Sequence, residues 1–158
     1  MNPLDLVDDI VIFDIDGVLA KFDFCNGKKF YNDECWVQLN MNRDMYNNIE
    51  RTSLFNGLID ELDPSRIYVI STACTSFEQN NKIKFIERIG KIRTDHIFFV
   101  GHDRYKKTIL QELRYKYDRS SHNHDRRIVM IEDSYSIMAD IEQLQNEKLR
   151  CFLVSDFI

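Results

Sequence analysis

The chain has 158 residues, of which 44% are hydrophobic and 30% are charged, a balance that is ordinary for a globular protein with a substantial core. Its formal net charge of −5 argues against a general electrostatic attraction to nucleic acid, although it leaves room for a local basic patch. The four cysteines show no C-x-x-C spacing, and no signal peptide or long apolar segment is visible, so we expect reduced thiols, a cytoplasmic location and no membrane association.

Five apolar runs predict β-strands that are covered on both faces. In each run the hydrophobic residues are continuous rather than alternating, which is typical of strands in the interior of a parallel sheet. Each run ends at a polar or small residue. The runs are IVIFD (10–14), RIYVIS (66–71), HIFFVG (96–101), RIVMIED (127–133) and RCFLVSD (150–156).

Helical patterns lie between the apolar runs. A broken helix is predicted over residues 46–62, ended by Pro64. The next helix is expected to begin with a capping box formed by Ser76 and Gln79 and to stop at Gly90. The apolar stripes of the later helices contain Phe77, Phe85, Ile86 and Ile89; then Ile109, Leu110, Leu113 and Tyr117; and finally Ile137, Ile141 and Leu144.

The alternation of strands and helices predicts an α/β fold, a three-layer, Rossmann-like arrangement with a mostly parallel sheet and helices on both faces. No internal repeat, low-complexity tract or linker is visible, so we expect residues 1–158 to form one domain. In open α/β sheets, ligands bind at the carboxyl ends of the strands, and the polar residues that follow the strands therefore belong together. They are Asp14, Asp16, Ser71, Lys106, Lys107, Glu132 and Asp133.

These side chains together predict a site for both a cation and an anion. Asp14, Asp16 and Asp133 would repel one another strongly without a bound metal ion. Oxygen ligands of this kind select a hard ion, so Mg²⁺ is expected rather than zinc. The Ser71 hydroxyl and a lysine would then face an anionic ligand. Carboxylates, Mg²⁺, a lysine and a hydroxyl at one site indicate phosphoryl transfer.

Each of these motifs also has a structural explanation when it is taken alone. Asp-x-Asp-Gly is a common turn, Asp133-Ser134 can cap the following helix, and Lys106 and Lys107 can be solvated residues of a helix start. A cation is disfavoured at a helix N-terminus, which points to another reason for one of the two lysines. The joint occurrence of the motifs favours catalysis.

The order of the motifs resembles that of the haloacid dehalogenase superfamily of phosphatases. The first motif of that family, two aspartates flanking one residue after an apolar strand, is matched by VIFDIDGVLA, and the second, a Ser or Thr that ends a strand, by IYVIST. The family's lysine at the start of a helix is matched within RYKKTIL, and its acidic fourth motif by IVMIEDS. The matching motifs span residues 10–134, most of the chain.

The resemblance implies a chemical role for each residue. Asp14 would be the nucleophile that forms an aspartyl-phosphate, and Asp16 would protonate the leaving oxygen and later activate water. Ser71 would hydrogen-bond the transferring phosphoryl group. One lysine would balance the charge of the nucleophile and the phosphate. Both Lys106 and Lys107 are candidates, and the spacing to the apolar stripe of the following helix slightly favours Lys107.

The same resemblance implies the metal ligands and the size of the lid. Asp14, the backbone carbonyl of Asp16 and Asp133 would hold Mg²⁺, with Glu132 either ligating the ion or positioning a ligand water. The insertion points at which members of this family carry caps are short in this chain. We therefore expect no large cap domain and at most a small lid around residues 21–45.

The lid segment interleaves aromatic and basic residues, which suits stacking on a base and binding the phosphate of a nucleotide or nucleic acid. The alternative is that its aromatic side chains belong to the core, and the two explanations carry about equal weight. The residues in question are Phe22, Phe24, Phe30, Tyr31 and Trp36, with Lys21, Lys28 and Lys29.

Two groups within the family are most similar to this chain. Polynucleotide 3′-phosphatases share the DGVLAK stretch and an ending like CFLVSDF, and 5′(3′)-deoxyribonucleotidases share DGVLA, KFIERIG and IFFVG. The long interval between the lysine and the fourth motif favours the former. We expect a Mg²⁺-dependent phosphomonoesterase for a nucleotide or a nucleic-acid end. The alternatives are a phosphatase of another small phosphorylated metabolite and a non-catalytic binding or regulatory protein.

Overall fold

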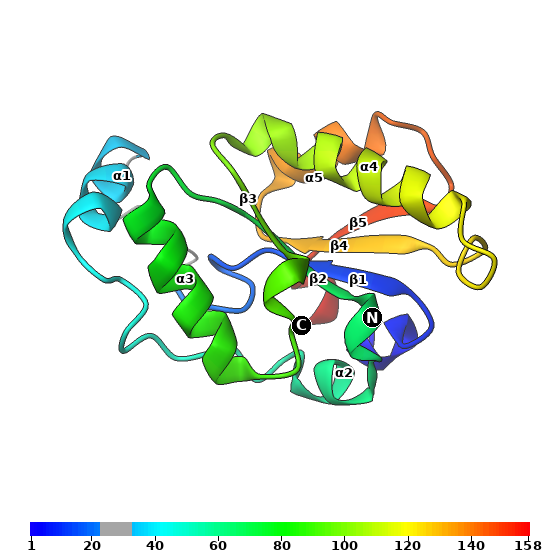
Figure 1. Ribbon diagram of the computed structural model, residues 1–158, viewed down its shortest axis with the longest axis horizontal. Helices are drawn as coiled ribbons and strands as arrows, with labels where there is room; N and C mark the ends of the chain where they lie inside the picture. Colours follow the sequence, from blue (N-terminus) through cyan, green and yellow to red (C-terminus); the bar gives the residue numbers. More distant parts are fainter. Residues whose placement is uncertain (23–32) are drawn as a thin grey trace.

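A five-stranded parallel sheet forms the centre of the computed structural model, which describes residues 1–22 and 33–158 (Figure 1). The strand order is β3-β2-β1-β4-β5, and every neighbouring pair runs parallel. All five apolar runs of the sequence therefore form strands. Their bounds are β1 (Ile10–Phe13), β2 (Ile67–Thr72), β3 (Ile97–Val100), β4 (Ile128–Glu132) and β5 (Leu149–Leu153). The prediction that each strand is covered on both faces is wrong for the edge strands β3 and β5, in which most residues are partly or fully exposed.

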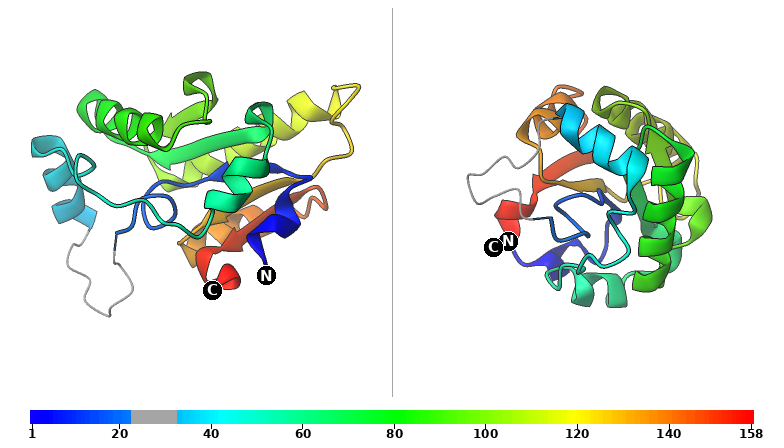
Figure 2. Two further views of the ribbon diagram at one scale, coloured as in Figure 1. Left: turned by 90° about the horizontal axis from the view of Figure 1, so that it is seen from below. Right: turned by 90° about the vertical axis from the view of Figure 1, so that its left-hand side faces the viewer.

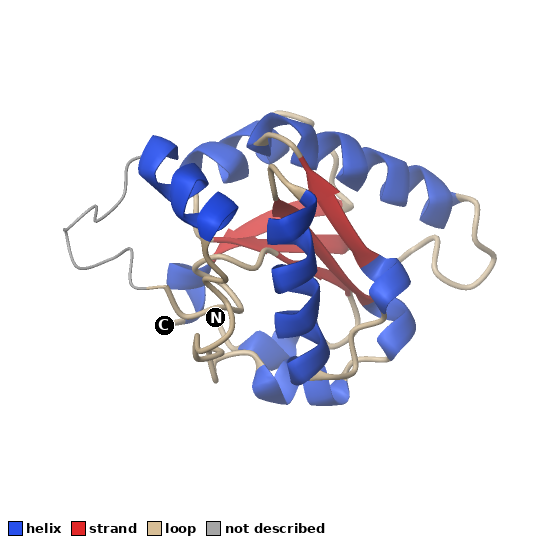
Figure 3. Ribbon diagram, turned by 60° about the vertical axis from the view of Figure 1, so that its left-hand side comes forward, coloured by secondary structure: helices blue, strands red, loops and turns tan. Residues whose placement is uncertain are grey.

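Helices cover both faces of this sheet, which confirms the expected three-layer α/β fold (Figures 2 and 3). Among the described residues, no helix is both long and apolar enough to cross a membrane. The α-helices are α1 (Asp33–Asn42), α2 (Asn56–Glu61), α3 (Ser76–Ile89), α4 (Lys106–Asp118) and α5 (Tyr135–Glu142). The short 3₁₀ helices are η1 (Pro3–Leu6), η2 (Pro64–Arg66), η3 (Thr94–His96), η4 (Asp103–Tyr105) and η5 (Val154–Phe157).

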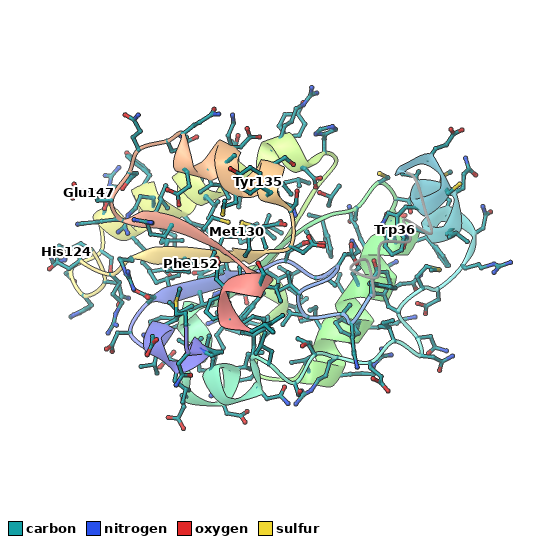
Figure 4. All side chains as sticks on the ribbon, turned by 180° about the vertical axis from the view of Figure 1, so that it is seen from behind. Trp36, His124, Met130, Tyr135, Glu147 and Phe152 are labelled. Atoms are coloured by element: carbon teal, nitrogen blue, oxygen red, sulfur yellow. The ribbon has the colours of Figure 1, made fainter. Side chains whose placement is uncertain are left out.

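The sheet separates two hydrophobic cores. Successive side chains of β1 enter opposite cores, because side chains alternate across a strand. Val11 and Phe13 pack in the core under α2 and α3, whereas Ile10 and Ile12 pack in the core under α4 and α5. Met130 of β4, labelled in Figure 4, belongs to the second core. Burial of each such side chain contributes about 1.5–3 kcal/mol, which explains why β1 is apolar throughout.

The direction of the connections between the strands reverses between β1 and β4. From β1 the chain adds β2 and β3 on one side, and it then returns to add β4 and β5 on the other side. Adjacent strands whose connections leave in opposite directions form the switch point at which open α/β sheets bind their ligands. Asp14 directly follows β1 and Glu132 ends β4, so the sequence motifs lie at this point.

Two of the predicted helices begin elsewhere than expected. Only Asn56–Glu61 of the predicted 46–62 helix is helical, because the preceding residues pair with the loop after β1, as in the hydrogen bond from Thr52 N to Leu19 O at 2.9 Å. The N-cap of α3 is Thr75 rather than Ser76, and the Thr75 side chain accepts a hydrogen bond from Glu78 N. With this start Phe77 lies outside the core.

The observed strand β5 ends earlier than the predicted strand 150–156. β5 ends at Leu153, and the residues that follow form η5. Phe157 of η5 packs against Phe55 in the first core, with ring centroids 5.4 Å apart. The apolar residues after Leu153 therefore serve the core as a helical turn rather than as an extension of the sheet.

Helix α1 lies beside α3, beyond the carboxyl ends of the strands (Figures 1 and 2). Its Trp36 packs edge-on against Phe22, with ring centroids 5.0 Å apart (Figure 4). Within the expected lid at 21–45, residues 23–32 lie outside the described residues, and with them Phe24, Lys28, Lys29, Phe30 and Tyr31. The described aromatic residues of the lid thus pack on one another.

Candidate active site

The loop after β1 places Asp14 at the edge of the sheet. The backbone N–H of Asp14 donates to Ile131 O at 3.1 Å, which continues the pairing of β1 with β4. The chain then folds back on itself, since the N–H groups of Leu19 and Ala20 donate to the carbonyl of Ile15. The residue Asp14 is only 4% exposed, so its carboxylate is buried at the carboxyl end of β1.

Gly17 allows this loop to pass beside β4. Its φ of +74° lies in the left-handed region, which glycine adopts without strain. A Cβ atom at this position would lie 2.3 Å from Asp133 Oδ2, a distance at which the Asp133 side chain would have to move. Glycine is therefore required both by the turn and by the carboxylate of Asp133 beside it.

Lys106 links the acidic residues of β1 and β4. It is buried at the first residue of α4, and its Nζ lies 2.5 Å from Glu132 Oε1 and 3.3 Å from Asp14 Oδ1. Burial alone would lower the pKa of Lys106, but the charges of Asp14 and Glu132 outweigh it and raise this pKa. The lysine is thus held as an ammonium ion between the two carboxylates.

The structure reverses the preference for Lys107. Lys106 lies four residues before Leu110 and seven before Leu113, so it continues the stripe of α4 that faces the sheet. One residue further along a helix turns the side chain by about 100°. Lys107 is therefore half-buried beside the stripe, and the ion pairs with the acids are those of Lys106.

Asp14, Glu132 and Asp133 form a group that is able to hold a divalent cation. One carboxylate oxygen from each lies within 4.8 Å of the others. Asp14 Oδ1 is buried and accepts no hydrogen bond within the described part of the chain, although the ammonium of Lys106 lies nearby. An all-oxygen donor set with an unsatisfied buried carboxylate oxygen fits Mg²⁺ better than a soft metal.

Glu132 differs from the other two members of this group. Its Oε1 contacts Lys106, and its Oε2 accepts hydrogen bonds from the backbone N–H groups of Asp133 and Ser134 at 3.1 and 3.2 Å. These contacts tie the end of β4 to the start of α5. Glu132 is thereby placed to position its neighbours, while Asp14 and Asp133 retain oxygens for a ligand.

The pKa values of these acids reflect crowding. Burial raises the pKa of Asp14, and the charge of Asp16 raises it further, against the opposing effect of Lys106. Burial also raises the pKa values of Glu132 and Asp133, and the charge of Asp14 adds to both. The group therefore holds more negative charge than its lysine balances, and a bound cation would relieve the repulsion.

Asp16 lies in a second polar group, in which Tyr46, Glu78 and Lys82 were not predicted from the sequence. Tyr46 Oη donates to Asp16 Oδ1 at 2.6 Å, and Lys82 Nζ donates to Asp16 Oδ2 at 2.7 Å. Lys82 also donates to Thr72 O at 2.6 Å and pairs with Glu78 at 3.2 Å. Lys82 occupies the same face of α3 as Phe85 and Ile86. A charged residue within an apolar stripe was the sequence signal from which Lys82 could have been predicted as part of the site.

The Ser71 hydroxyl belongs to this second group. Ser71 is fully buried, and its Oγ accepts a hydrogen bond from Lys82 Nζ at 3.1 Å. The more exposed hydroxyl at the end of β2 is that of Thr72, which donates to Asp103 Oδ1. A direct contact of Ser71 with a phosphoryl group stays a prediction.

The site thus contains two linked clusters, one around Lys106 and one around Lys82. A scan against models of known protein families and a search of curated proteins returned no match to this chain. The chemistry proposed below is supported by the geometry of the described residues and by the order of the motifs.

Proposed function

We propose that this chain is a Mg²⁺-dependent phosphomonoesterase that forms an aspartyl-phosphate on Asp14. The observation that carries this proposal is the state of the Asp14 carboxylate. It is buried at the switch point of the sheet, and its Oδ1 accepts no hydrogen bond from the described residues. The ammonium of Lys106 and a carboxylate oxygen of Asp133 both lie nearby. A nucleophile that must face a cation and an anionic substrate needs this kind of surrounding.

Asp14 and Asp133, with the backbone carbonyl of Asp16, would hold the metal ion. When bound, Mg²⁺ supplies charge neutralisation for the nucleophile and for the oxygens of the phosphoryl group. Lys106 adds a fixed positive charge beside Asp14. The two cations would together offset the repulsion between a carboxylate and a phosphate dianion.

Asp14 and Asp16 have different roles in the proposed reaction. In the first step, an Asp14 oxygen attacks phosphorus, the bond from phosphorus to the leaving oxygen breaks, and Asp16 gives its proton to that oxygen. In the second step, Asp16 takes a proton from water as the water oxygen attacks phosphorus. The aspartyl-phosphate bond breaks, which releases inorganic phosphate and restores the Asp14 carboxylate.

Exposed aromatic residues that follow three of the strands support a nucleotide or nucleic-acid end as the substrate. Phe77, Tyr105 and Tyr135 are 45%, 47% and 70% exposed, and each lies within five residues after the end of β2, β3 or β4. The guanidinium of Arg104 lies over the Tyr105 ring, 4.8 Å from its centroid. Aromatic faces and a cation near a phosphate site suit base stacking and backbone binding.

A phosphatase screen tests this proposal. Mg²⁺-dependent release of phosphate would be compared among 3′- and 5′-mononucleotides, 3′- and 5′-phosphorylated oligonucleotides and sugar phosphates. We expect nucleotide or oligonucleotide substrates to be preferred and chelation of Mg²⁺ to abolish turnover. A preference for sugar phosphates would contradict the substrate class, and turnover that persists without divalent cations would contradict the metal.

A further inference from the structure

We propose that Lys82 and Tyr46 are positioning residues that hold the carboxyl group of Asp16 for proton transfer. This inference rests on the proposed function, since it assigns the means by which Asp16 reaches the leaving oxygen. Neither residue belongs to the motifs that identified the site, and the contacts between these side chains and Asp16 appear only in the folded chain.

Tyr46 and Lys82 contact different oxygens of the Asp16 carboxyl group. Tyr46 Oη contacts Oδ1 at 2.6 Å, and Lys82 Nζ contacts Oδ2 at 2.7 Å. Two contacts on opposite oxygens fix the plane of the group, which a single hydrogen bond does not. Each carboxylate oxygen has two lone pairs, so one contact on each leaves a lone pair to carry the transferred proton.

Lys82 is anchored far more firmly than a surface lysine. Its side chain is 0% exposed, and its ammonium contacts Asp16, the Ser71 hydroxyl, the Thr72 carbonyl and Glu78 within 3.2 Å. Burial of a cation is costly unless it is paired and hydrogen-bonded in this way. A buried ammonium does not reach the substrate, so its effect on the reaction passes through Asp16 and Ser71.

The ring of Tyr46 is fixed on several sides. It packs edge-on against Phe22 and at a tilt against Phe85, with ring centroids 5.5 and 6.1 Å away, and Lys82 Nζ lies 5.5 Å from its centroid. Its backbone carbonyl accepts a hydrogen bond from Arg88. A hydroxyl on a ring packed this tightly holds its partner in one place.

Asp16 itself remains partly accessible. Its side chain is 19% exposed, whereas that of Lys82 is fully covered. The carboxyl group is therefore supported by a buried ammonium and keeps some contact with solvent. This division separates the group that moves the proton from the groups that hold it.

The decisive experiment compares two substrates with different leaving groups. 2,4-Dinitrophenolate leaves as a stable anion and needs no proton, whereas the alkoxide of an alkyl phosphate such as a nucleoside monophosphate does. Tyr46→Phe removes one oxygen and keeps the packed ring. We expect it to lower kcat/KM for the alkyl phosphate by about 10- to 100-fold and for 2,4-dinitrophenyl phosphate by less than about threefold.

Lys82→Gln should show the same selectivity with a larger effect, because it also removes the partner of Glu78 and Ser71. If this variant does not fold, Tyr46→Phe carries the test alone. Tyr117→Phe is the matched control, since the Tyr117 hydroxyl contacts that of Tyr68 at 2.6 Å in the other core. It should change neither rate.

A double variant separates positioning from general stabilisation. In an Asp16→Ala background, Tyr46→Phe should cost nothing further, because the two residues act as one unit. Equal losses on both substrates, or a full additional loss in the double variant, would overturn the inference and leave the proposed function intact. A wild-type protein that hydrolyses neither phosphate would overturn both.

Discussion

Buried carboxylates are paired differently at the amino and the carboxyl ends of the strands. Near the amino ends of the strands, Asp9 is buried and accepts hydrogen bonds from Arg127 Nε and Nη2 at 3.0 and 2.7 Å. Arg66 caps the same corner by donating to the backbone carbonyls of Val7 and Asp9. The Asp9 carboxylate thus forms a bidentate pair with the Arg127 guanidinium, and both of its oxygens accept hydrogen bonds.

At the carboxyl ends, acids outnumber the bases that pair with them. Asp14, Asp16 and Glu132 pair with two buried lysines and Asp133 lies beside them, while among the described residues Asp14 Oδ1 accepts no hydrogen bond. A fold selected only for stability gains nothing from such crowding, because burial of the Asp14 and Glu132 carboxylates carries a desolvation cost. The contrast suggests that the amino edge serves folding and the carboxyl edge serves a ligand.

The largest expected effect is the loss of activity on replacing an aspartate by asparagine at the carboxyl edge, compared with the same replacement at the amino edge. Asp14→Asn should abolish phosphatase activity, by at least about 10⁴-fold, because the nucleophile is lost. In the metal-free protein it should also raise the free energy of unfolding, since it removes one of several crowded charges. Phosphate release and urea unfolding measure the two quantities.

Asp9→Asn is the matched variant at the amino edge. It should lower the free energy of unfolding by about 1 kcal/mol, because it breaks a charge-assisted pair with a half-exposed arginine. Its activity should equal that of the wild type. If Asp14→Asn destabilised the metal-free protein as Asp9→Asn does, the proposed difference between the edges would be wrong.

A smaller effect is expected from removing a metal ligand. Asp133→Ala should weaken the apparent Mg²⁺ affinity by at least about tenfold, since it removes a carboxylate oxygen beside Asp14. Calorimetric titration with Mg²⁺ measures this change. Asp125→Ala, which removes a carboxylate from the exposed loop before β4, is the control and should leave the affinity unchanged. Equal affinities in both variants would exclude Asp133 as a ligand.

The smallest effect is a dependence of stability on pH at the carboxyl edge. Burial and the charge of Asp14 raise the pKa of Asp133 to about 7 and raise the pKa of Glu132 as well. An acid whose pKa is higher in the folded state stabilises the fold in its protonated form, and this contribution is lost as the pH rises through the folded-state pKa. Metal-free protein should therefore lose stability progressively as the pH rises from about 4, near the unfolded-state pKa of a carboxyl group, to about 8.

Mg²⁺ should reverse this trend, because it binds the ionised carboxylates and competes with protons. The Mg²⁺-induced rise in Tm should be larger at about pH 8 than at about pH 6, by about 2–4 °C for each kcal/mol of added stability. Thermal unfolding with and without Mg²⁺ measures the difference. An equal rise at both pH values would mean that protons and the metal do not share these carboxylates.

Much of the site could be predicted because its residues follow strands. Asp14, Glu132 and Asp133 are brought together by the register of β1 with β4, and apolar runs ending in acids suffice to predict that meeting. The limits of the helices were harder to predict. The chain before α2 pairs with the loop after β1, and such a contact between distant segments outweighs local helix preference.

By itself, the sequence determined the five strands, their parallel arrangement and the acids that follow β1 and β4. The reason is that continuous hydrophobicity and strand-end polarity are local properties. Only the tertiary structure decided between Lys106 and Lys107. The two residues are adjacent on α4 and point in different directions, so that Lys106 is buried against the acidic residues and Lys107 is only half-buried. It alone brought Lys82 and Tyr46 to Asp16, since pairing of buried polar groups depends on which distant segments pack together.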